Sequence, residues 1–214
     1  MLINYYDLCK YHKVRDWTIK NIPQINISES ISPNQISSKL WLVQELKKTI
    51  SNIPLNIEIV GGWFGWPLIG MLYKEFDIEK IFMYDIDKNA CRVAIQYREI
   101  FNKNKDDIWI LNENYWTRSV KRYVPNLVIN CSSEHMKETF YEFNNYSKDC
   151  IFAIQSNNMF HIEDHVNCVE DEDDMIFRHG IRNIVYSGNQ NIIEWDGFKI
   201  KDSTYKRFMV IGKI

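Results

Sequence analysis

Residues 57–65 read Ile-Glu-Ile-Val-Gly-Gly-Trp-Phe-Gly, and residues 80–87 read Lys-Ile-Phe-Met-Tyr-Asp-Ile-Asp. Each segment is a short apolar run that ends in residues typical of turns, which predicts a buried strand. Between the two runs, residues 66–76 carry apolar side chains at helical spacing. A strand, a helix and a second strand in this order predict a βαβ unit with parallel strands.

The same alternation continues on both sides of this unit. Further helices are predicted at residues 5–19, 38–51, 88–101 and 134–143. Further strands are predicted at residues 107–111, 127–130, 150–154, 183–186, 192–195 and 205–211, with a turn at 187–189. This order predicts a parallel sheet with helices on both faces, and the last strands indicate an antiparallel edge. Pro23 and Pro33 are expected to interrupt the chain, so residues 1–36 are predicted to extend outside a domain formed by residues 37–214.

Composition limits the function classes. The chain has 214 residues, 45% hydrophobic and 25% charged, which is typical of one globular domain. The 26 basic and 28 acidic residues give a formal net charge of −2. This balance excludes a broadly basic nucleic-acid-coating surface; a nucleic-acid partner remains open but is not indicated by charge. The sequence shows no apolar run long enough for a membrane helix and no apolar signal-peptide core, so a cytoplasmic location without a membrane partner is expected.

Two patterns bear on metal binding. The five cysteines are widely spaced and never form CxxC, so reduced thiols are expected instead of a disulfide framework or a zinc site. His161, His165 and Cys168 lie close together in the sequence, but the spacing is not that of HExxH. We therefore predict a polar loop or a helix surface here and no metal site.

The glycine-rich turn is the first functional signal. Ligands of open parallel sheets bind beyond the carboxyl ends of the strands. Gly61, Gly62 and Gly65 follow the first strand of the unit, where glycine permits a tight turn and a close approach of the backbone to a ligand. Asp85 ends the next strand, where a carboxylate can accept both hydroxyl groups of a ribose. These residues together predict an adenosine-type cofactor.

With these residues in place, the stretch from about Leu55 to Met136 resembles a class I S-adenosylmethionine-dependent methyltransferase. The resembling segments are residues 57–65, residues 84–94 (Tyr-Asp-Ile-Asp-Lys-Asn-Ala-Cys-Arg-Val-Ala) and residues 127–130. The resemblance implies an α/β fold, a Rossmann-like three-layer sandwich whose seven-stranded, mostly parallel sheet has an antiparallel terminal strand. It also implies S-adenosylmethionine as the cofactor.

The resemblance further implies how the cofactor is held. The glycines of the turn would face its methionine part, Asp85 would hold the ribose hydroxyls, and Ile86 would pack on the adenine. Asn112 and Asn114 would lie near the adenine amino group. The complete cofactor site expected in this way consists of Gly61, Gly62, Trp63, Gly65, Asp85, Ile86, Asn112, Asn114, Asn130 and Cys131.

Two residues depart from the family pattern. Trp63 stands where the family usually has glycine, and the family's acidic residue usually lies one position later than Glu58. Either the turn is remodelled or the cofactor affinity has changed. A NAD-dependent dehydrogenase fits less well, because the turn is not GxGxxG and the segment after Asp85 fits the methyltransferase pattern better.

The acceptor side is less defined. Residues 130–135 read Asn-Cys-Ser-Ser-Glu-His, in place of the Asn/Asp-Pro-Pro-aromatic signature of many amino-methyltransferases. Glu134 and His135 could orient or deprotonate an acceptor; alternatively, the preceding serines cap a helix whose dipole Glu134 favours. Asn157 is a third candidate, within a polar run at 155–158 that could equally form a turn.

The sequence thus predicts an S-adenosylmethionine-dependent methyltransferase that acts on a small-molecule or nucleotide-like acceptor, with Glu134, His135 and Asn157 as candidate catalytic residues. Two alternatives remain. The enzyme could transfer the aminocarboxypropyl group of the same cofactor, or the chain could be an inactive S-adenosylmethionine-binding or partner module. Trp63 in the turn favours the inactive module, whereas Glu134 and His135 argue against it.

Overall fold

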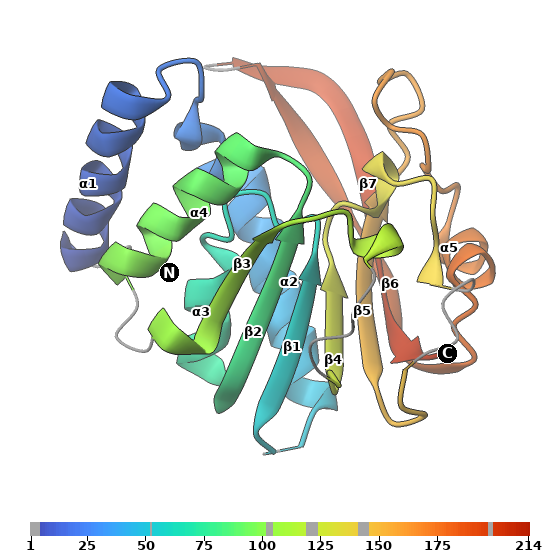
Figure 1. Cartoon of the computed structure of the whole chain (residues 1–214). Coiled ribbons are helices and arrows are strands. Elements are labelled where there is room, and N and C mark those ends of the chain that lie inside the picture. Colours follow the sequence, from blue (N-terminus) through green and yellow to red (C-terminus); the bar gives the residue numbers. More distant parts are fainter. Residues whose placement is uncertain (1–4, 52, 102–104, 119–123, 141–145, 197–198) are drawn as a thin grey trace.

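The computed structural model describes residues 5–51, 53–101, 105–118, 124–140, 146–196 and 199–214. Its centre is a seven-stranded sheet with the order β3-β2-β1-β4-β5-β7-β6 (Figure 1). The strands are β1 (Leu55–Val60), β2 (Ile78–Asp85), β3 (Ile108–Asn112), β4 (Leu127–Asn130), β5 (Ile151–Asn157), β6 (Asn183–Asp196) and β7 (Lys199–Lys213). β7 is antiparallel to both of its neighbours, and the other pairs are parallel. The predicted fold class is therefore confirmed.

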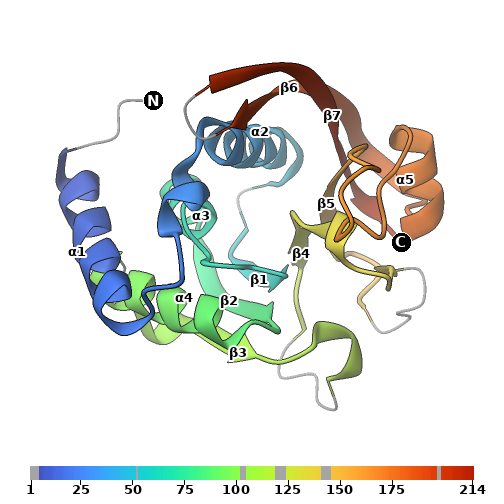
Figure 2. The same cartoon turned by 90° about the horizontal axis from the view of Figure 1, so that it is seen from above.

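The two faces of the sheet are covered differently. The α-helices are α1 (Tyr5–Asn21), α2 (Pro33–Thr49), α3 (Leu68–Glu75), α4 (Lys88–Phe101) and α5 (Glu172–His179). The 3-10 helices are η1 (Ile27–Ile31), η2 (Lys105–Asp107), η3 (Tyr115–Thr117) and η4 (Ser133–His135). α2, α3 and α4 pack on one face, and α1 lies against α4 farther out (Figure 2). Within the described residues, α5, short 3-10 turns and loops cover the opposite face.

Side-chain alternation along the strands explains the two cores. In β1, Ile57 and Ile59 face the α2–α4 core, whereas Val60 faces the core under α5. Successive strand residues point to opposite faces, so each parallel strand needs apolar side chains on both. This requirement produces the short, almost continuously apolar runs of the sequence.

Several predicted boundaries are corrected by the structure. α2 begins at Pro33 and not at residue 38, because proline fits the first helical turn and Ser32 accepts the Gln35 N–H as the N-cap. The predicted helix 134–143 is replaced by η4 and a loop up to residue 140, and residues 141–143 lie outside the described residues. The predicted turn at 187–189 is wrong, because β6 runs through it paired with β7.

The N-terminal residues share the main core. Val14 on α1, Ile22 and Ile27 are buried in the same cluster as Leu42 on α2. The predicted domain boundary at residue 37 falls inside α2. No helix in the described parts of the chain is both long and apolar enough to cross a membrane.

Candidate active site

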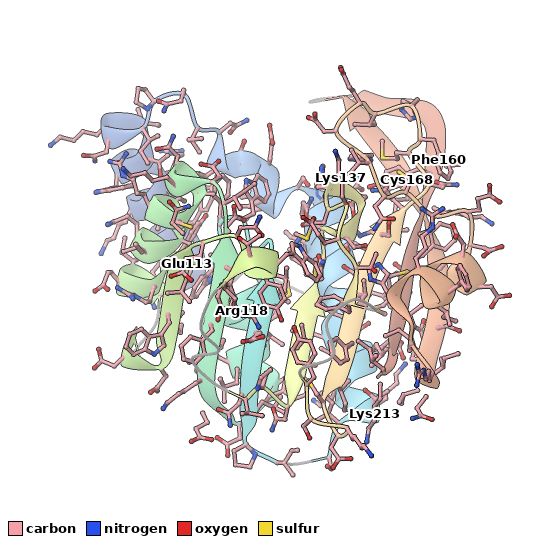
Figure 3. The ribbon with its side chains drawn as sticks, turned by 45° about the vertical axis from the view of Figure 1, so that its right-hand side comes forward. Glu113, Arg118, Lys137, Phe160, Cys168 and Lys213 are labelled. Carbon is pink, nitrogen blue, oxygen red and sulfur yellow. The ribbon has the colours of Figure 1, made fainter. Side chains whose placement is uncertain are left out.

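A cavity of 430 Å³ opens at the carboxyl ends of the parallel strands, where sheets of this type bind their ligands. Its walls come from the turn after β1, the end of β2 and the segments after β3 and β4. Figure 3 labels Glu113, which belongs to the wall after β3. The predicted cofactor residues that line this cavity are Gly61, Gly62, Trp63, Gly65, Asp85, Ile86, Asn114 and Cys131. The structure thus brings most of the predicted cofactor site together.

The turn after β1 keeps a glycine-type backbone at Trp63. Gly61 and Gly65 have φ angles of 61° and 72°, and Trp63 has a φ of 51°. Residues other than glycine rarely occupy this left-handed region. The Trp63 ring stacks on Phe64, with centroids 4.2 Å apart, and forms part of the cavity wall. Trp63 therefore adopts a backbone conformation that glycine adopts more readily.

Asp85 connects the turn to the end of β2. Its Oδ2 accepts the Trp63 N–H at 2.7 Å, and its Oδ1 accepts the Asp87 N–H at 2.8 Å. Burial raises the pKa of the Asp85 carboxyl, although these N–H groups favour the charged form. An ionised carboxylate offers about four acceptor positions. Each oxygen can therefore accept a further hydrogen bond from a ligand hydroxyl.

Ile86 fits the expected contact with an adenine ring. Its side chain is 76% exposed, although it is large and apolar, and it belongs to the cavity lining. Asn112 lies outside the lining. Its Nδ2 donates to the carbonyls of Asp85 and Ile86 and so holds the backbone after β2. Asn130 also lies outside the cavity lining. Its buried side chain accepts the Ser132 N–H on Oδ1 and donates from Nδ2 to the Met136 sulfur.

Glu134 lies at the opposite wall of the cavity, after β4. It is 4% exposed, lines the cavity, and accepts Asn157 Nδ2 at 2.9 Å and Arg207 Nη1 at 3.2 Å on its Oε1. Its Oε2 is buried and has no hydrogen-bond partner in the described part of the chain. Arg207 also donates to the Cys131 carbonyl. One carboxylate oxygen thus remains available for a donor or a cation.

Asn157 and His135 stand in different positions around Glu134. Asn157 is buried at the end of β5, outside the cavity lining, and its Nδ2 holds Glu134 while its Oδ1 faces His165. Asn157 therefore contacts Glu134 from outside the cavity. His135 is exposed and lines the cavity, and its Nδ1 lies 3.2 Å from the Asp164 carbonyl oxygen.

Two cations of the site were not found from the sequence. Lys39 on α2 lines the cavity and donates to the Gln35 side chain. Burial lowers the pKa of Lys39 to about 8, and the nearby Cys131 and Glu134 oppose that shift. Arg207 lies on β7, more than 70 residues after Glu134. The only sequence feature that marks Arg207 is its position directly before the apolar run 208–211.

Glu58, the acidic residue one position before the family's usual one, faces away from the turn after β1. It lies in the core under α5, where its Oε2 accepts the Tyr115 hydroxyl at 2.7 Å and pairs with Arg118 at 3.1 Å. Figure 3 labels Arg118 beside the sheet. The shift by one position moves the carboxylate to the other face of β1, as strand alternation requires. Glu58 therefore anchors η3 and does not line the cavity.

The fold resembles those of solved methyltransferases. NodS, an N-methyltransferase from Bradyrhizobium japonicum solved with S-adenosylhomocysteine, aligns over 95% of this chain and 98% of its own, with a TM-score of 0.60 and 9% identity. YcgJ from Bacillus subtilis aligns over 83% and 98%, with a TM-score of 0.61 and 8% identity. The C-terminal domain of precorrin-6Y C5,15-methyltransferase from Rhodobacter capsulatus aligns over 82% and 89%, with a TM-score of 0.54 and 8% identity.

Comparisons of the sequence itself are negative. No protein-family model matches the chain, and no curated protein matches it either. At identities of this size the structural likeness concerns the fold. The chain has the Rossmann-like fold of the class I S-adenosylmethionine-dependent methyltransferases.

Proposed function

We propose that this chain is an S-adenosylmethionine-dependent methyltransferase that acts on a small-molecule or nucleotide-like acceptor. The observation that carries the proposal is the cavity. It joins the glycine turn, Asp85 and Ile86 on one side to Glu134 and His135 on the other. One end of the cavity is suited to an adenosine group, and the other carries polar side chains for an acceptor.

The first side would hold the cofactor. The backbone of the turn would face the methionine part, Asp85 would accept the ribose hydroxyls, and the exposed Ile86 would cover the adenine near Asn114. When bound, S-adenosylmethionine supplies a methyl group that its positively charged sulfur has already activated. The residues of the chain therefore contribute mainly by aligning the acceptor with that methyl group.

The second side would orient the acceptor. Glu134 is fixed by Asn157 and Arg207 through one oxygen, so its other oxygen can accept a hydrogen bond from an acceptor N–H or O–H. His135 is exposed at the same wall and can take a proton where the acceptor must lose one. A volume of 430 Å³ is at the lower end of ligand pockets. An acceptor that shares this cavity with the cofactor must therefore be a small molecule or one projecting group such as a nucleobase.

Calorimetric titration with S-adenosylmethionine and S-adenosylhomocysteine, with NAD as a control ligand, tests the cofactor assignment. We expect micromolar binding of the first two and none of NAD. Ile86→Ala should weaken S-adenosylhomocysteine binding roughly tenfold, because apolar cover of the adenine is lost. Asp85→Ala should weaken it at least about tenfold through the loss of charge-assisted hydrogen bonds.

Phe177→Ala is the matched control for Ile86→Ala, because Phe177 is also exposed but lies on α5, outside the cavity lining. The Ile86 side chain is largely exposed, and Asn112 holds this position through the backbone carbonyl, so Ile86→Ala separates loss of cofactor contact from damage to the turn. If the wild type binds neither ligand, or if both Ile86→Ala and Asp85→Ala bind as tightly as the wild type, the proposal is wrong. Product analysis then separates the reactions: methyl transfer releases S-adenosylhomocysteine, whereas aminocarboxypropyl transfer releases methylthioadenosine.

A further inference from the structure

Three potential metal ligands lie together: Glu134 and His135 line the cavity, and His165 lies next to them outside its lining. Glu134 and His135 belong to η4, and His165 comes from the loop after β5. Each residue offers one ligand atom, and these atoms all lie within 4.8 Å of one another. The rings of His135 and His165 meet edge to face, with centroids 4.6 Å apart. Figure 3 shows the loop after β5 through its labelled residues Phe160 and Cys168.

Glu134 has one carboxylate oxygen that is not used by the protein. Its Oε1 is saturated by Asn157 and Arg207, whereas its buried Oε2 has no hydrogen-bond partner among the residues that the structure describes. A buried charged oxygen without a partner is costly, because it has lost its contact with water. The nearby cations are directed elsewhere: Arg207 bonds Oε1 and the Cys131 carbonyl, and Lys39 bonds Gln35.

The two histidines are held in the same way. His135 Nδ1 lies 3.2 Å from the Asp164 carbonyl oxygen, and His165 Nδ1 lies 3.2 Å from Asn157 Oδ1. Both partners are acceptors, so in the neutral rings Nδ1 carries the hydrogen and Nε2 carries the lone pair. The orientation of the Asn157 amide is set by its other contacts, since Oδ1 also accepts the Met159 N–H and Nδ2 donates to Glu134. Metal-binding histidines are oriented by such hydrogen bonds from the second ring nitrogen.

We propose that Glu134, His135 and His165 bind one divalent transition-metal ion at the acceptor side of the cavity. Two imidazoles and one carboxylate suit zinc, iron, manganese or cobalt better than magnesium or calcium. Ligands about 2.1 Å from a common ion lie roughly 3.5 Å apart, so side-chain shifts of about 1 Å complete the site. Three protein ligands leave a position for an acceptor oxygen or nitrogen, whose proton the ion makes easier to remove. With the ion bound, Glu134 and His135 act on the acceptor through the ion, in place of the direct hydrogen bond and proton transfer described for the metal-free site. The role of the ion in deprotonating an acceptor rests on the proposed function. The binding of the ion by these three residues does not.

The test uses the full chain, stripped with a chelator, and zinc chloride as the probe. Calorimetry should show one equivalent bound with micromolar affinity, because Arg207 and Lys39 oppose a cation nearby. His135→Ala and His165→Ala should each weaken zinc binding at least about tenfold. Cobalt added in place of zinc should give a visible absorption band that both variants lose.

His161→Ala is the matched control, because His161 is an exposed histidine of the same loop and should bind zinc like the wild type. Circular dichroism establishes that each variant is folded, and His135 is itself exposed. The proposal is overturned if the wild type binds no zinc at 100-fold excess over the protein, or if His135→Ala and His165→Ala bind it as tightly as the wild type. S-adenosylhomocysteine titration of the same variants keeps the two proposals apart, since His165→Ala should retain cofactor binding whether or not zinc binds.

Discussion

Trp63 adopts a backbone conformation that normally selects glycine, and the surrounding contacts make it adopt that conformation. Its N–H donates to Asp85, and its ring stacks on Phe64. The neighbouring glycine is restricted as well, because a methyl group at Gly62 would lie 2.2 Å from Met83 Cγ. The turn is therefore held by β2 as much as by its own glycines.

Substitution at position 63 isolates this backbone effect. Trp63→Gly and Trp63→Ala both remove the indole, but only alanine retains a Cβ at a φ of 51°. We expect Trp63→Gly to be more stable than Trp63→Ala by about 1 kcal/mol. Urea unfolding of the two variants measures the difference. Equal stabilities, or a more stable alanine variant, would show that the turn relaxes to another conformation.

Lys39 introduces a pH dependence near the cavity. Burial lowers its folded-state pKa to about 8 from the 10.5 of a free lysine, so the unfolded chain binds more protons between these pH values. The free energy of unfolding therefore increases as the pH rises from 8 to 10.5, because the buried Lys39 loses its charge. This increase is lost again as the pH falls to 8. Lys39→Met should be more stable than the wild type at pH 7 by on the order of 2 kcal/mol, and the difference should shrink by pH 10.

Urea unfolding of wild type and Lys39→Met at pH 7, 8, 9 and 10 checks this expectation. Other groups titrate in both proteins, so the comparison uses only the difference between them. A difference that is the same at every pH would mean that Lys39 is solvated like a free lysine.

At the scale of elements, the sequence predicts the order of strands and helices well, because apolar runs and helical spacing are local patterns. Residues 88–101 and 127–130 are helix and strand with the predicted bounds. The predicted helix at 134–143 fails for a long-range reason. The Glu134 carbonyl, which would accept an N–H one turn later in a helix, instead accepts the Asn167 N–H at 2.9 Å. Asn157 and Arg207 hold its side chain as well.

The predicted turn at 187–189 fails for a similar reason. A methyl group at Gly188 would lie 2.6 Å from the Tyr186 hydroxyl, and that hydroxyl accepts Trp41 Nε1 of α2 at 3.1 Å. The glycine thus makes room for a tyrosine within a continuous strand, as glycine in strands often does. Propensity alone treats it as a turn former.

The residues of the candidate site also fall into those that a local pattern identifies and those that long-range contacts bring in. The glycine turn and Asp85 follow one another in a short stretch of sequence, so a sequence pattern can identify them. Lys39 and Arg207 reach the cavity from α2 and β7, and the contact of His165 with Asn157 depends on the course of a loop. These contacts exist only after the sheet has formed, so no local pattern predicts them.

At the scale of the whole molecule, the two faces of the sheet differ in what they bury. The face under α2–α4 is covered by helices, whereas the core under α5 contains the imidazole ring of a buried histidine. His179 is fully buried beside Phe140, with centroids 5.9 Å apart. Neither ring nitrogen has a hydrogen-bond partner within the described residues. Burial lowers the pKa of His179 to about 4 from 6.5.

This difference makes the molecule sensitive to acid. The unfolded chain takes up a proton at His179 below pH 6.5, while the folded chain resists it until about pH 4. The stability that the neutral ring preserves is present above pH 6.5 and is lost as the pH falls to 4, by on the order of 2 kcal/mol. His179→Leu removes the titration, so the variant should lose less stability than the wild type between pH 7 and pH 4.5. Urea unfolding across this range measures both slopes, with His161→Leu as the control at an exposed histidine. Parallel slopes for wild type and His179→Leu would contradict this expectation, because the folded His179 ring would then bind its proton as readily as the ring in the unfolded chain.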